Sequence, residues 1–67
     1  MWHVYICDRA GQLYAGITTN LGHRMRQHDA HLLYSEEHAN KHEAALRVKE
    51  IKGWRREKKL ALVNGLR

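Results

Sequence analysis

Two short runs of β-branched and aromatic residues, joined by a turn, open the chain and constrain its fold more than any other feature. Residues 2–7 (WHVYIC) and 12–17 (QLYAGI) each predict a strand. Between them, residues 8–11 (DRAG) predict a tight turn in which Gly11 can adopt a positive φ. We therefore expect a β-hairpin. Gly16 inside the second strand predicts either a bulge or the close approach of another group to the backbone.

A helix and a third strand are predicted after the hairpin. Thr18 or Thr19 can cap a helix that runs to about Asp29. Residues 31–36 (HLLYSE) then predict a short third strand.

Two further helices are predicted in the C-terminal part of the chain. Asn40 and Glu43 have the spacing of a capping box. Apolar residues recur behind this box at helical spacing: Ala44, Val48 and Ile51. Gly53 is expected to end this helix, and residues 54–63 predict another that stops near Gly65. The order ββαβαα predicts an α/β (α+β) fold with a small antiparallel or mixed three-stranded sheet flanked by helices.

The length and the single cysteine limit the organisation of the chain. Its 67 residues are enough for one domain, residues 1–67, with a thin core. Cys7 cannot form a disulfide within the chain, and we expect a buried thiol in a reducing cytosol. No apolar run approaches the roughly 20 residues that span a bilayer, and no signal-peptide pattern is present. We therefore expect a cytoplasmic protein without a membrane partner.

The positive charge is concentrated in the second half of the chain. Residues 1–40 carry three basic and four acidic side chains, whereas residues 41–67 carry nine basic and three acidic ones. A basic half of this kind favours a polyanionic partner such as DNA. A solvated lysine-rich helix face would give the same pattern, so charge alone does not decide between the two.

A succession of motifs makes the hairpin more specific. Its strands carry His3-Val4-Tyr5 and Tyr14-Ala15-Gly16. Further motifs follow in order: residues 16–21 (GITTNL), Arg24-Met25, His28, residues 33–37 (LYSEE), 51–54 (IKGW) and 58–62 (KKLAL). Over nearly its whole length the chain resembles the GIY-YIG endonucleases, in particular their small stand-alone bacterial members.

The resemblance implies a site and a reaction. The family has a small antiparallel sheet flanked by helices, and it hydrolyses a DNA phosphodiester with one divalent metal, Mg²⁺ or Mn²⁺. By position, Tyr5 and Tyr14 would line the site beside Gly16. Arg24 would hold the scissile phosphate, and His28 stands where the family has Tyr or His. The predicted catalytic residues are therefore Tyr5, Tyr14, Arg24 and His28, and Gly16 has a structural role in the site.

The chemistry of these side chains agrees with such roles. The guanidinium of Arg24 can bind two phosphate oxygens at once. Arg24 and His28 are four residues apart, so both can face one pocket. Basic residues that follow are predicted to contact nucleic acid: Lys52, Arg55, Arg56, Lys58 and Lys59. Each has a simpler interpretation, since Tyr5 and Tyr14 could be cross-strand partners and an arginine is usually just exposed.

Two departures from the family pattern affect these expectations. The position of the family's metal-binding glutamate falls on Val48, which cannot coordinate a divalent cation, so cleavage is expected to be impaired. Neither Glu43 nor Glu50 shares a helix face with Val48. In addition, only residues 29–31 stand between His28 and Leu32, where members of the family usually have a considerably longer segment. So short a connection could force another strand pairing, or favour a homodimer or an element-swapped dimer.

Three alternatives remain open at this point. One is a nuclease whose metal is held by another acid, and a second is a nucleic-acid-binding domain derived from the same fold that does not cleave. A third is a zinc protein, because His38 and His42 have helical ligand spacing, although no cysteine partner or HExxH motif accompanies them. Metal-dependent nicking separates the first two alternatives.

Overall fold

The computed structural model describes residues 1–65 and has its elements in the order ββαβαα. They are β1 (Trp2–Arg9), β2 (Gln12–Thr18), α1 (Leu21–His28), β3 (His31–His38), α2 (Lys41–Lys52) and α3 (Arg56–Val63). The strands form one sheet in the order β2-β1-β3, and both neighbouring pairs are antiparallel. The predicted α/β (α+β) fold with a three-stranded sheet is confirmed, and its sheet is antiparallel rather than mixed.

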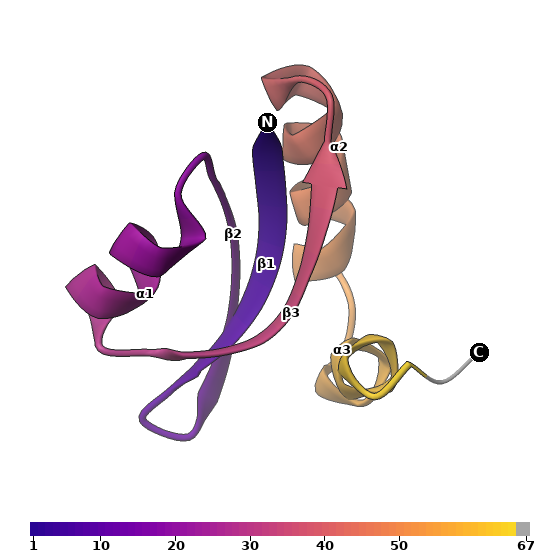
Figure 1. The fold of residues 1–67 in the computed structure, drawn as a ribbon. Helices are drawn as coiled ribbons and strands as arrows, with labels where there is room; N and C mark the ends of the chain where they lie inside the picture. Colours follow the sequence, from indigo (N-terminus) through magenta and orange to yellow (C-terminus); the bar gives the residue numbers. More distant parts are fainter. Residues whose placement is uncertain (66–67) are drawn as a thin grey trace.

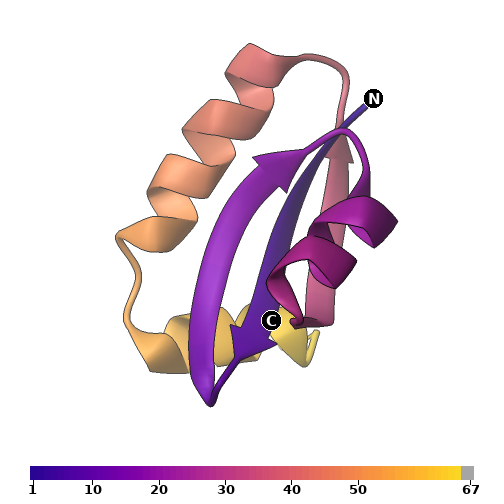
Figure 2. The same cartoon turned by 90° about the vertical axis from the view of Figure 1, so that its left-hand side faces the viewer.

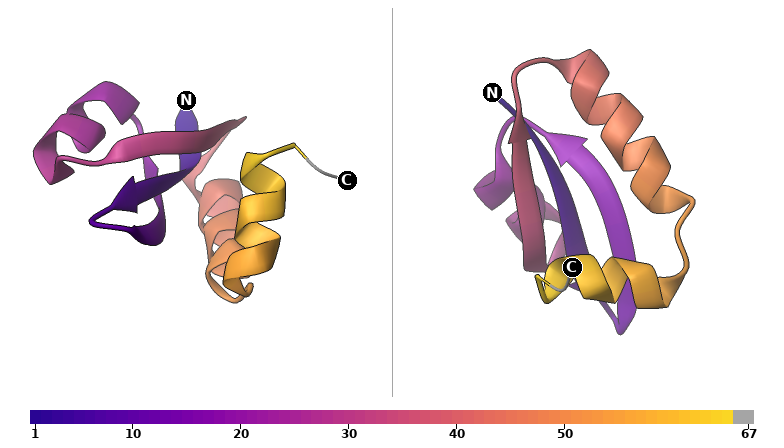
Figure 3. Two further views of the ribbon diagram at one scale, coloured as in Figure 1. Left: turned by 90° about the horizontal axis from the view of Figure 1, so that it is seen from below. Right: turned by 90° about the vertical axis from the view of Figure 1, so that its right-hand side faces the viewer.

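The two faces of the sheet are covered by different helices. Figures 1 and 2 show α1 on one side of the strands and α2 on the other. Because side chains alternate along a strand, Val4 and Ile6 of β1 point toward α2, whereas Tyr5 and Cys7 point toward α1. α3 runs across one end of the sheet on the α2 side (Figure 3). The sheet therefore separates an α1 face from an α2 face.

The main hydrophobic cluster lies on the α2 face. Its buried members come from β1 and α2: Val4, Ile6, Ala44, Val48 and Ile51. Leu62 and Val63 of α3 pack against this cluster, as does Trp54 from the segment before it. Burial of one side chain such as Ile51 contributes about 1.5–3 kcal/mol, so these few residues supply much of the folding free energy.

The cap of α1 differs from the sequence prediction, which chose Thr18 or Thr19. Asn20 caps the helix instead, and its Oδ1 accepts a hydrogen bond from the His23 amide at 3.0 Å. Thr18 ends β2 and is buried, and its hydroxyl oxygen accepts from the Asn20 amide at 3.1 Å. The threonine thus stabilises the turn that leads into the helix.

The remaining caps follow the sequence more closely. The Asn40 side chain accepts a hydrogen bond from the Glu43 amide at 2.9 Å, which confirms this cap of α2. The helix runs to Lys52, and Gly53 is its C-cap. α3 begins at Arg56 rather than Trp54. Among residues 1–65, no helix is long and apolar enough to cross a membrane.

The hairpin has its glycines where the backbone requires them. Ala10 and Gly11 both have positive φ, 53° and 80°, and the Gly11 amide donates to Asp8 Oδ1 at 3.0 Å. Gly16 is a site of close approach and not a bulge, because it pairs directly with Tyr5 in the ladder. The irregularity in the sheet falls instead between Ile6 and Cys7, where β1 pairs with β3.

The short connection after α1 does not prevent β3 from pairing within the chain. Asp29 adopts the left-handed conformation, with φ and ψ both 50°, and its amide donates to the Arg26 carbonyl. This single residue reverses the chain direction, and His31 already pairs with Asp8 of β1. The connection therefore forces no other pairing.

Candidate functional site

A pocket of about 140 Å³ opens on the α1 face of the sheet. Five side chains line it: Tyr5, Cys7, Arg9, Tyr14 and His28. Three of them are alternate residues of β1, and Tyr14 joins them because it pairs with Cys7 across the hairpin. His28 comes from the last turn of α1. The structure thus brings three of the four predicted catalytic residues into one pocket.

Tyr5 is the buried wall of this pocket. Its ring lies over Gly16, where an added methyl carbon would be 2.5 Å from the tyrosine hydroxyl oxygen and 2.8 Å from Cζ. Any side chain at position 16 would require the Tyr5 ring to move. Burial raises the pKa of the Tyr5 hydroxyl, against the opposing effect of the nearby Arg24 charge. At neutral pH the hydroxyl is therefore protonated and can donate a hydrogen bond.

Tyr14 is the exposed counterpart of Tyr5. Its side chain is 46% exposed, and its hydroxyl donates to Gln12 Oε1 at 3.2 Å. Neither tyrosine is simply the other's cross-strand partner, because Tyr5 pairs with Gly16 and Tyr14 with Cys7. Tyr5 is consequently a buried residue of the pocket and Tyr14 an exposed one.

Arg24, the fourth predicted residue, does not line the pocket but contacts His28, which does. The Nη1 atom of Arg24 and the Nε2 atom of His28 are 3.3 Å apart. Because a guanidinium can only donate, Nε2 is the acceptor in this contact. The predicted proximity of these two side chains is confirmed, but only His28 lines the pocket; both side chains are partly buried.

Cys7 and Arg9 also line the pocket, although neither is among the site residues predicted from the sequence. Burial raises the pKa of the Cys7 thiol, which is only 4% exposed. It is therefore a neutral wall of the pocket, as the expected buried thiol, and not a nucleophile. Strand alternation from Tyr5 would have identified both residues, because residues 5, 7 and 9 share one face.

Val48, where the resemblance places the metal-binding glutamate, lies away from the pocket. It is 9% exposed and packs in the core with Val4, Ile6 and Ile51. The core is on the α2 face, so the sheet stands between Val48 and Tyr5. The expectation that this position belongs to the same site as the tyrosines is not met in this fold.

The basic residues predicted to contact nucleic acid lie on the side of α2 and α3. Lys52, Arg55, Arg56 and Lys58 are exposed, and Lys59 is half-buried. The Lys58 Nζ atom lies 4.4 Å from the centroid of the Trp54 ring and forms a cation–π interaction with it. The structure does not bring these residues to the pocket, because α1 and α3 lie on opposite sides of the sheet (Figure 1).

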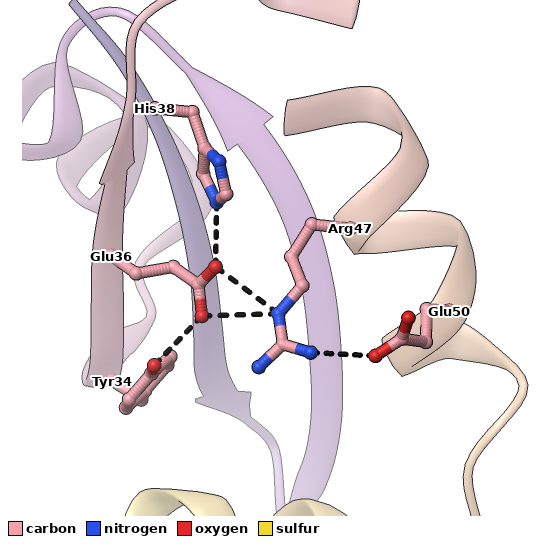
Figure 4. Close-up of polar contacts among 5 residues, drawn as sticks. All are labelled: Tyr34, Glu36, His38, Arg47 and Glu50. Atoms are coloured by element: carbon pink, nitrogen blue, oxygen red, sulfur yellow. Dashed lines mark hydrogen bonds and ion pairs between the residues drawn. The ribbon is translucent and has the colours of Figure 1, made fainter. Parts of the chain in front are cut away.

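A second polar cluster joins β3 to α2 (Figure 4). The Glu36 carboxylate accepts hydrogen bonds from the Tyr34 hydroxyl at 2.7 Å, from His38 Nε2 at 2.6 Å and from Arg47 Nε at 3.1 Å. Arg47 also donates to Glu50 at 2.6 Å. No local pattern in the sequence indicates this cluster.

The partners of Glu36 control its charge state. Burial by itself raises the pKa of this carboxyl, but the hydrogen bonds from Tyr34 and His38 and the Arg47 charge outweigh burial and leave the pKa below its usual value. His38 is thus bound to a carboxylate rather than paired with His42. Among residues 1–65, no three His, Cys, Asp or Glu side chains gather as a metal site would require.

Comparison with known proteins adds no relative. No family model, no curated protein and no solved structure matches the chain.

Proposed function

We propose that this chain is a GIY-YIG-type nuclease domain that binds a DNA phosphodiester in the pocket on the α1 face, and that its metal-dependent cleavage is impaired. The observation that carries the proposal is the convergence of Tyr5, Tyr14 and His28 on one pocket, with Arg24 bonded to His28. These side chains come from β1, β2 and α1, so only the folded chain brings them together.

The size of the pocket favours a small anionic group. Pockets for drug-sized ligands occupy roughly 300–1,000 Å³. A volume of about 140 Å³ is too small for such a molecule, and it suits a single phosphate group that projects from a longer polymer. The opening to solvent beside the exposed Tyr14 leaves room for the rest of that polymer.

The donors around the pocket match a phosphodiester. The Arg24 guanidinium can donate to two phosphate oxygens while His28 holds its orientation. The protonated Tyr5 hydroxyl can donate from the pocket wall, and Tyr14 can do so after it releases Gln12. A phosphodiester offers hydrogen-bond acceptors only, so each of these groups would bind it as a donor.

The residues of the pocket do not fit a divalent metal. Mg²⁺ and Mn²⁺ prefer carboxylate oxygens, and none of the five lining residues is Asp or Glu. Val48 lies in the core across the sheet, where a longer side chain would meet Val4 and Ile6. We therefore derive no hydrolytic step through a metal for this chain.

The second candidate function is nucleic-acid binding without cleavage, and the buried place of Val48 favours it. In this case Arg24 and the tyrosines would hold the backbone, and the exposed Lys52, Arg55 and Arg56 would add contacts from the opposite side of the domain. DNA would then contact the protein at two separate surfaces. Binding should weaken steeply with salt under either candidate, because both rest on phosphate contacts.

Two assays on the same proteins test the proposal. The first is nicking of supercoiled plasmid with Mg²⁺ or Mn²⁺, and the second is fluorescence anisotropy with a labelled DNA duplex. We expect weak or no nicking, together with duplex binding that Arg24→Ala reduces and Arg26→Ala does not. Arg26 is the matched control because it is an exposed arginine on the same helix. Robust metal-dependent nicking would refute the impairment, and equal binding by both variants would refute the site.

A further inference from the structure

Arg9 is a charged side chain of the pocket whose charge is not neutralised. It ends β1, is exposed, and lines the pocket with Tyr14 and His28. Its neighbour Asp8 faces the other side of the strand and accepts a hydrogen bond from the Gly11 amide. Among residues 1–65, Arg9 forms no ion pair, because the ion pairs found there involve Glu36 and Glu50.

Arg9 and Arg24 stand at different places along the pocket. The charge of Arg24 acts on the Tyr5 hydroxyl, and the charge of Arg9 acts on the Cys7 thiol. Arg9 is four positions after Tyr5 in β1, so their Cα atoms are about 13 Å apart along an extended strand. The two guanidinium groups therefore come to the pocket from different elements: Arg9 lines it from the end of β1, and Arg24 of α1 contacts the lining residue His28. Two separate positive charges suit a polymer with several phosphates better than one isolated phosphate.

We propose that Arg9 is a second phosphate-binding residue of this site, which contacts a phosphate neighbouring the one held by Arg24, so that the pocket binds the DNA backbone without a divalent metal. This inference rests on the proposed function, since it needs DNA in the pocket. It adds a residue that the family resemblance does not assign. In this proposal the two arginines bind the phosphates in place of a metal, but they do not replace the metal in hydrolysis.

The electrostatics of the pocket support binding without a metal. Two guanidinium groups neutralise two phosphates directly, and they would repel a divalent cation placed between them. Each guanidinium also offers several N–H donors to phosphate oxygens, which makes the contact stronger than that of a point charge. The neutral Cys7 and Tyr5 between them do not oppose an anion.

The test is a salt series of anisotropy titrations with a labelled DNA duplex in EDTA. It compares the unchanged chain with Arg9→Ala, Arg24→Ala and Arg26→Ala. We expect binding to persist in EDTA and Arg9→Ala to weaken it about tenfold, as the loss of a charged hydrogen bond would. The slope of log K against log salt should become shallower by about 0.9, which corresponds to one phosphate contact. Arg26→Ala should change neither quantity comparably.

The other outcomes are separable. If Arg24→Ala weakens binding but Arg9→Ala behaves like Arg26→Ala, the role of Arg9 is overturned and the proposed function stands. If the unchanged chain binds only with Mg²⁺, the metal-free mode is overturned. If the chain does not bind, or Arg24→Ala binds unchanged, the proposed function fails and this inference with it. Circular dichroism of each variant checks the fold, and the exposed position of Arg9 makes unfolding unexpected.

Discussion

The two faces of the sheet are built from the same three strands but differ in what covers them. On the α2 face, Ala44, Val48 and Ile51 are buried against Val4 and Ile6. On the α1 face, none of the residues of α1 is fully buried, and an open pocket lies between the helix and the strands.

This difference places the hydrophobic cluster and the proposed binding site on opposite sides of one thin sheet. A 67-residue domain can bury little, and here it concentrates apolar burial on one face. The other face carries the pocket that we propose as a phosphate-binding site. Substitutions on the α2 face should therefore act on folding, and substitutions on the α1 face should act mainly on binding.

The largest expected effect comes from Val48→Glu. A carboxylate at this buried position has no partner among Val4, Ile6 and Ile51, so we expect the free energy of unfolding to fall by about 3–5 kcal/mol, as for other uncompensated buried charges. Leu46→Glu is the control, because Leu46 is 57% exposed on the same helix and should change stability little. Urea denaturation followed by tryptophan fluorescence measures both. A stable Val48→Glu variant that nicks DNA with Mg²⁺ would contradict the division between the faces.

An intermediate effect is expected from Gly16→Ala. The added methyl would lie 2.5 Å from the Tyr5 hydroxyl oxygen, so the ring must move into the pocket, at a cost of about 1–3 kcal/mol typical of overpacking. DNA binding should weaken as well.

Gly22→Ala is the matched control for this substitution. Gly22 lies in α1, and its nearest neighbour to a new Cβ is 3.8 Å away, so alanine should stabilise the helix by up to about 1 kcal/mol. Chemical denaturation should show that Gly16→Ala lowers the free energy of unfolding and that Gly22→Ala raises it. Equal and small effects would show that Tyr5 does not rest on Gly16.

The smallest effect concerns Glu36 and its dependence on pH. Near neutral pH, Glu36→Gln should destabilise the domain by about 1 kcal/mol, because it removes the charge that Arg47 and its neighbours bind. The folded state lowers the pKa of Glu36, so its contribution is present above the unfolded value of 4.5 and is lost as pH falls through the lower folded value.

The control for Glu36 is its neighbour Glu37, which is exposed and lies opposite His3 in the strand register, on the α1 face. We expect unfolding experiments between pH 7 and pH 3 to show the gap between the unchanged chain and Glu36→Gln closing at acid pH. Glu37→Gln should show no such gap. A gap that is constant with pH would mean that Glu36 acts through packing and not through its charge.

Features set by local sequence were predictable. The hairpin and the Asn40 cap depend on neighbouring residues, and both are confirmed. The cap of α1 was misassigned because Thr18 and Asn20 both offer a suitable oxygen, and only the end of β2 decides between them. The pocket residues Tyr5, Tyr14 and His28 came from the family resemblance, whereas Arg9 required attention to strand alternation.

Features set by packing between distant elements were not predictable. Glu36 and Arg47 belong to different elements, and nothing in the local pattern indicates that they meet. The helical spacing of Val48 predicted an apolar face of α2 correctly, but it does not say which side of the sheet that face covers. For this reason the separation of Val48 from the tyrosines appeared only in the structure.

The most direct test of the division between the faces is a titration of a labelled DNA duplex with the unchanged chain and with Arg24→Ala, in EDTA and at several salt concentrations. We expect salt-dependent binding by the unchanged chain, and a clear loss by Arg24→Ala with no change in its unfolding free energy. Equal binding by the two proteins, or a loss of binding that only follows a loss of stability, would contradict a phosphate site on the α1 face.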